Sequence, residues 1–154
     1  MKLAEALADR ADASRRVEQL RSRIVANARY QEGEQPTEDA AELLTRATEA
    51  CAELESLISR INRTNSATPL GEGTVTDALA RRDALRLRHS VVSAAADAAS
   101  GRGQPGMRQM RSELKMLAAL PVADLRAEAD RLAQQIRELD TAIQRTNWEV
   151  DLLD

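Results

Sequence analysis

Seven polar residues in the middle and near the end of the chain have side chains that could bind a ligand. Arg82 and His89 are seven residues apart in an otherwise apolar row of helical spacing, so both need polar partners. One hypothesis is a pocket in which the arginine and asparagine amides bind a small anionic or polar ligand. The other, which we favour, is a hydrogen-bonded plug that fixes the register of the helices. The candidate set is Asn62, Thr64, Asn65, Arg82, Asp83, His89 and Asn147, and Trp148 follows the last of them.

The same residues offer little for catalysis. No serine or cysteine stands at a recognisable spacing from His89, the single histidine. Arg86 occupies the position three before it, where a carboxylate-bridged metal site would need a glutamate. Cys51, the single cysteine, lies on an apolar stripe and is expected to pack as a small hydrophobic residue. We therefore expect no catalytic residue, no metal and no cofactor, without excluding an enzyme.

The composition predicts the class of fold. Hydrophobic residues make up 43% of the 154 residues and are mostly Ala and Leu, aromatic residues make up 1%, and charged residues make up 31%. This composition is typical of long helices or coiled coils. We expect one all-α domain over residues 1–154, with four long helices arranged as two antiparallel hairpins of coiled-coil character.

Apolar periodicity and turn residues set the expected boundaries. The predicted helices cover residues 2–28, 37–65, 75–100 and 122–152. Thr37 is expected to cap the second helix, and Gly101 to supply a left-handed residue after the third. In residues 101–121, the first six are predicted to form a loop, and residues 107–121 either a short helix or a short extended arm. We favour the extended arm, because Pro121 disfavours helical geometry in the residue before it.

Assembly is the expected role of the apolar surfaces. In the second helix, Leu44, Cys51 and Ile58 widen the apolar stripe beyond a single seam. Near the C-terminus, Trp148, Leu152 and Leu153 either pack on their own chain or anchor a neighbouring subunit, and we favour the anchor. We expect a homo-oligomer, with a small ligand as an open alternative. A net charge of −3 without a basic stripe, and no long apolar segment, indicate neither nucleic acid nor membrane as partner. The expected location is the cytoplasm.

Five short segments carry a resemblance to a known family. They are QEGEQP at Gln31, INRTN at Ile61, TDALARRDALRLRH at Thr76, SELK at Ser112 and QRTNW at Gln144. With them, the chain resembles small bacterial proteins labelled septicolysin-like, over nearly its whole length. The resemblance implies an all-helical protein without an established role and no catalytic residue to transfer. The family name suggests a cytolysin, which the low aromatic content does not support.

Overall fold

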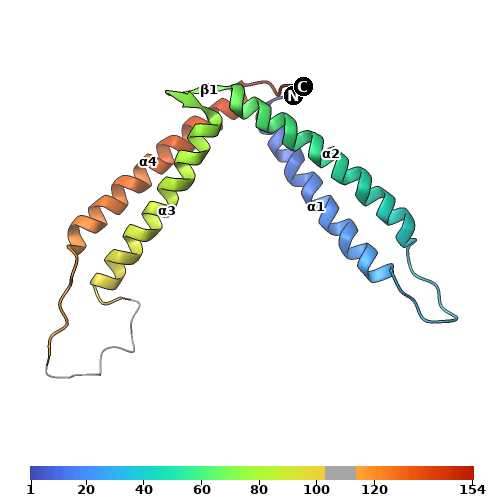
Figure 1. The fold of residues 1–154 in the computed structure, drawn as a ribbon, viewed down its shortest axis with the longest axis horizontal. Helices are drawn as coiled ribbons and strands as arrows, with labels where there is room; N and C mark the ends of the chain where they lie inside the picture. The colour runs from blue at the N-terminus through green and yellow to red at the C-terminus, as the bar shows by residue number, and fades with distance from the viewer. Residues whose placement is uncertain (103–113) are drawn as a thin grey trace. The chain divides into compact units, whose positions relative to one another are not determined.

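A computed structural model describes residues 1–102 and 114–154. The helices are α1 (Leu3–Asn27), α2 (Ala40–Ala67), α3 (Val75–Ala99) and α4 (Val122–Glu149), and a two-stranded hairpin lies between α2 and α3 (Figure 1). The all-α prediction is confirmed, and each predicted helix is present with its ends shifted by three residues or fewer.

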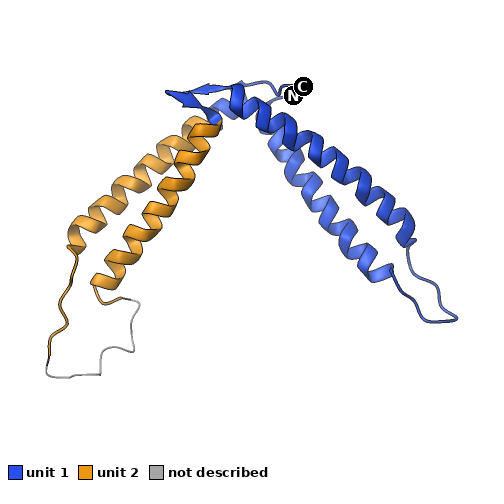
Figure 2. Ribbon diagram, viewed as in Figure 1, with its two compact units in different colours: residues 1–75, 144–154 blue, residues 76–143 orange. Residues whose placement is uncertain are grey.

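The chain divides into two compact units (Figure 2). Unit 1 holds residues 1–75 and 144–154, and unit 2 holds residues 76–143. α1 and α2 pair in unit 1, whereas ion pairs from Arg82 to Asp140 and from Asp97 to Arg126 show that α3 and α4 run antiparallel in unit 2. A single folding domain over the whole chain stays a prediction.

Unit 1 has two apolar clusters along the α1–α2 pair. In one, Leu3 and Ile61 are 0% and 1% exposed and pack with Ala6 and Leu152. In the other, the buried residues are Leu20, Leu43 and Ala50, with Val17, Ile24 and Ala47 against them. The apolar spacing of the two helices therefore produces a seam between them.

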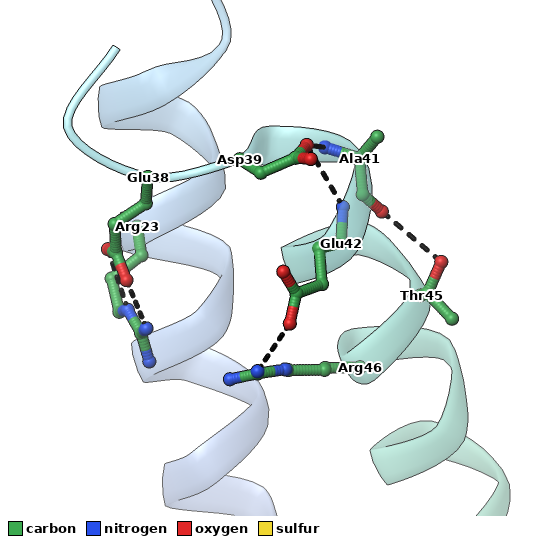
Figure 3. A network of polar contacts seen from close by, with 7 residues as sticks. All are labelled: Arg23, Glu38, Asp39, Ala41, Glu42, Thr45 and Arg46. Carbon is green, nitrogen blue, oxygen red and sulfur yellow. Dashed lines mark hydrogen bonds and ion pairs between the residues drawn. The ribbon is translucent and has the colours of Figure 1, made fainter.

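The start of α2 differs from the prediction. Its N-cap is Asp39, whose carboxylate accepts hydrogen bonds from the backbone N–H groups of Ala41 at 2.9 Å and Glu42 at 3.3 Å (Figure 3). The prediction that Thr37 is the N-cap was wrong, because Glu38 is bound to α1 and is not free to begin the helix. Its carboxylate pairs with the Arg23 guanidinium, with 2.9 Å from Nε to Oε2, and its backbone N–H donates to Asn27 Oδ1 at 3.0 Å.

The connection from α2 to α3 contains a hairpin that was not expected from the sequence. β1 (Pro69–Leu70) pairs antiparallel with β2 (Gly73–Thr74) around Gly71, which has a φ of +64°. The Val75 N–H donates to the Thr68 carbonyl at 3.0 Å, so the chain enters α3 directly from the hairpin. The glycine supplies the left-handed conformation that this tight turn requires.

The end of α3 follows the prediction. Gly101 has a φ of +82°, its N–H donates to the Ala98 carbonyl at 3.1 Å, and the Arg102 N–H donates to the Asp97 carbonyl at 2.9 Å. This is the pair of bonds of a Schellman motif. Residues 114–121 form neither a helix nor a strand, and the first part of the predicted arm, 107–113, lies outside the described residues.

Candidate functional site

The polar residues that the sequence singled out belong to both units. Arg82, Asp83 and His89 lie on the part of α3 in unit 2. Asn62, Thr64 and Asn65 lie near the end of α2, and Asn147 near the end of α4, all in unit 1. Each unit contains its own set of contacts, and the combined ligand site stays a prediction.

Thr64 fixes the C-terminal segment of the chain. Its side chain is 0% exposed, and its hydroxyl donates to the Arg60 carbonyl at 2.8 Å while accepting from the Leu153 N–H at 3.0 Å. Arg60 Nε also donates to the Leu153 carbonyl at 3.0 Å. Thr64 therefore has a structural role that accounts for its burial, since a buried hydroxyl requires hydrogen-bond partners. Asn62 is exposed, and Asn65 and Asn147 are half-buried.

The two ends of the chain pair beside this contact. The Leu3 N–H donates to the Val150 carbonyl and the Leu152 N–H donates to the Met1 carbonyl, each at 2.9 Å. Lys2 Nζ lies 2.9 Å from an Asp151 carboxylate oxygen, and this hydrogen bond and the Lys2 charge hold the pKa of Asp151 below its ordinary value. We name these paired residues, 1–3 and 150–154 with Arg60 and Thr64, the terminal clasp.

The clasp changes the interpretation of the apolar tail. Leu152 is only 9% exposed, because it packs against Leu3, Ala6 and Ile61 of its own chain. Trp148 and Leu153 remain 64% and 46% exposed. Only these two residues of the predicted anchor present a free surface to a neighbouring subunit.

In unit 2, Asp140 is the main partner of the candidate arginine. Arg82 Nη1 lies 3.3 Å from one Asp140 oxygen, and Arg86 Nη2 lies 3.0 Å from the other. Asp83 is 3.5 Å from Arg82 Nε, a buried atom with no hydrogen-bond acceptor among the described residues. The charge of Arg82 is thus compensated within unit 2 by Asp140 of α4. From the sequence, Asp140 could only be placed outside the apolar stripe of its helix, not beside Arg82.

His89 is half-buried on α3. Among residues 1–102 and 114–154, no cluster of three His, Cys, Asp or Glu side chains could hold a metal ion. Within the same residues, no helix is both long and apolar enough to cross a membrane.

Two rows of exposed apolar residues are the surfaces that the candidate set overlooked. The α2 row consists of Leu44, Cys51 and Ile58, which are seven residues apart. Cys51 is exposed, so the prediction that it packs as a small hydrophobic residue was wrong. The α3 row has 4-3 spacing, and all its members are exposed in the chain. It consists of Ala80, Ala84, Leu87, Val91, Ala94 and Ala98. The 4-3 spacing of the α3 row was visible in the sequence, but alanine is compatible with either a core or a surface.

The chain belongs to a family of unknown function, DUF6847, whose model matches residues 10–152. It is also similar to a solved structure described as that of a functionally unknown conserved protein from Corynebacterium diphtheriae. The two are 40% identical, each is covered over 99% of its length, and the TM-score is 0.91. None of the curated proteins matches the chain. The septicolysin-like assignment was wrong, because the chain belongs to this family of unknown function and neither the family nor this relative shows a link to septicolysin.

Proposed function

We propose that this chain is a structural protein that self-assembles through coiled-coil surfaces. The observation that supports this proposal is the exposure of apolar residues at heptad spacing in each unit. On α2, Leu44 is 58% and Ile58 39% exposed; on α3, Leu87 is 68% and Val91 60% exposed. Rows of this spacing are the contact surfaces of coiled coils, whereas isolated exposed apolar residues need no partner.

A direct test is native mass spectrometry of protein purified without added ligand. We expect a species of two or more chains of 16.9 kDa each, whose population rises with protein concentration. A single chain at all concentrations, confirmed by sedimentation, would contradict self-assembly.

A small-ligand-binding oligomer is the second candidate, and one observation favours it. Arg82 Nε is buried without a hydrogen-bond acceptor among the described residues, which is costly unless a ligand or water supplies one. The engagement of the same side chain by Asp140 weighs against it. The same mass spectra test this candidate, because a bound molecule would add a constant mass that Arg82→Ala removes and Arg81→Ala, at the exposed neighbouring position, retains.

We further propose a cytoplasmic location. Cys51 is an exposed thiol, and such thiols stay reduced in the cytosol and oxidise readily outside it. Fractionation of cells that express the protein at its natural level would test this, and recovery outside the cytosol would contradict it.

A further inference from the structure

The α3 row lies on the side of its helix opposite the one that contacts α4. Arg82 reaches Asp140 of α4, and Ala96 is 0% exposed. At 100° per residue, these two positions point away from Leu87 and Val91. The row spans 19 residues, from 80 to 98, or about 28 Å of helix. α3 therefore presents a complete second seam that no described residue of unit 2 covers.

The composition of the row fits another helix at close range. Four of its six members are alanine, and the two larger residues, Leu87 and Val91, lie at its centre. Small residues let helix axes approach to the lower end of the usual 8–10 Å range. Central leucine and valine then supply most of the apolar contact.

The charges beside the row fit a second copy of α3, and they differ between its two possible orientations. Asp83 and Arg88 flank the row on opposite sides and are five residues apart, the separation that brings them together across a parallel coiled coil. In an antiparallel pair with the rows fully overlapped, Arg88 would instead face the partner's Arg88, and Asp83 would face the partner's Asp97. The parallel pair thus joins opposite charges twice, whereas the antiparallel pair joins like charges.

The existing ion pairs of these residues leave them available. Arg88 pairs with Glu128 and Asp83 with Arg82, but the Arg88 and Asp83 side chains are 62% and 69% exposed. Ion pairs this exposed contribute little, so a partner can share or replace them.

An apolar groove continues the surface at the end of the row. It has a volume of about 520 Å³, and its lining includes Ala98 and Gly101 together with Met116, Leu117 and Leu120. Met116 and Leu117 are 80% and 84% exposed. A stable interface buries about 800 Å² per partner, and a single helix contact about 28 Å long is short for that area. The groove extends the apolar surface beyond the end of the row and would add to the buried area.

We propose that the α3 row is a dimer interface with a second copy of this chain, parallel across a two-fold axis, in which Asp83 meets the partner's Arg88. This inference rests on the proposed self-assembly and goes beyond it by naming the surface, the partner and the orientation.

Disulfide cross-linking tests the orientation, with Cys51→Ser as the background so that no native thiol takes part. In a parallel dimer, position 87 faces the partner's position 87; in the antiparallel arrangement it faces position 91. Leu87→Cys alone should therefore form covalent dimers under a mild added oxidant. We expect a rate at least about tenfold above that of Ala127→Cys, an exposed control position on α4, because assembly raises the effective thiol concentration.

Three results would overturn the proposal in distinguishable ways. If covalent dimers form only when Leu87→Cys and Val91→Cys chains are mixed, the dimer is antiparallel and the proposed orientation is wrong. Leu87→Cys rates no higher than the control, in protein that sedimentation shows to be assembled, would move the interface elsewhere and leave self-assembly standing. A monomeric wild-type protein would contradict both the proposed self-assembly and the proposed α3 interface.

The charge pairing has its own test. Asp83→Arg would place an arginine beside the partner's Arg88, so we expect dimerisation about three- to tenfold weaker at low salt, since like charges across a coiled coil oppose association. Asp130→Arg makes the same change of charge at an exposed site on α4 and should leave the dissociation constant unchanged. Equal effects of the two variants would contradict the pairing.

Discussion

The two units stabilise their pairs of antiparallel helices with different contacts. Unit 1 adds the two chain ends to its helices, and the terminal clasp places Leu152 against Leu3 and Ile61. Unit 2 has no comparable addition among its described residues, and four ion pairs cross between α3 and α4. Both units leave an apolar row exposed, but the α2 row of unit 1 has three members seven residues apart, whereas the α3 row of unit 2 has six members at 4-3 spacing. The longer and more regular row of unit 2 is the reason why we propose the α3 row, and not the α2 row, as the interface.

Truncating the clasp should have the largest effect on stability. Leu152→Ala removes a side chain that is 9% exposed and leaves a cavity beside Leu3, so we expect a loss of about 2–4 kcal/mol in the free energy of unfolding, measured with urea. Leu153→Ala, the adjacent residue at 46% exposure, is the matched control and should cost less than about 1 kcal/mol. Equal losses would mean that the clasp is not part of the unit 1 core.

The Asp140 pair should matter less. Asp140→Ala removes the shared acceptor of Arg82 and Arg86, whose guanidinium groups lose a charged partner in a part-buried setting. We expect a loss of about 1–2 kcal/mol, recovered in part by adding Arg82→Met, because the uncompensated charge is then gone. Asp130→Ala, at an exposed position of α4, is the control. An unchanged stability in Asp140→Ala would show that unit 2 does not depend on these ion pairs.

The smallest effect concerns pH, and it belongs to unit 1. The hydrogen bond and the charge of Lys2 lower the pKa of Asp151 below its ordinary value. The stability that this pair contributes is therefore present above the ordinary pKa and is lost as the pH falls through the lower pKa of the folded state. Asp151→Asn should flatten the acid limb of stability below about pH 4, the ordinary pKa of an aspartate carboxylate. Glu149→Gln, an exposed neighbour, should not. Identical acid limbs for wild type and Asp151→Asn would contradict the role of the pair.

The sequence predicted the helices well because their signals are local. Apolar spacing and the glycine after α3 depend on neighbouring residues, and Gly101 has the expected left-handed conformation. The start of α2 was misplaced because a tertiary ion pair, Arg23 to Glu38, decides where the chain becomes helical. The clasp was also beyond prediction, since Thr64 and Leu153 meet across 89 positions of sequence.

The candidate site was predicted less well for a physical reason. Residue types alone indicate that Arg82 needs a partner, but not that Asp140 on another helix supplies it. Alanine in the α3 row is equally compatible with burial and exposure, so the sequence could not separate its two apolar faces. The exposure of Leu87 and Val91 makes that distinction.

In the proposed dimer, the exposed α3 row of unit 2 joins two chains. Sedimentation equilibrium of the wild type and of Leu87→Glu with Val91→Glu tests it most directly, because both side chains are exposed in the single chain and their replacement should preserve helicity by circular dichroism. We predict a wild-type dimer of two 16.9 kDa chains and a monomeric variant. A variant that keeps the wild-type mass would contradict the claim.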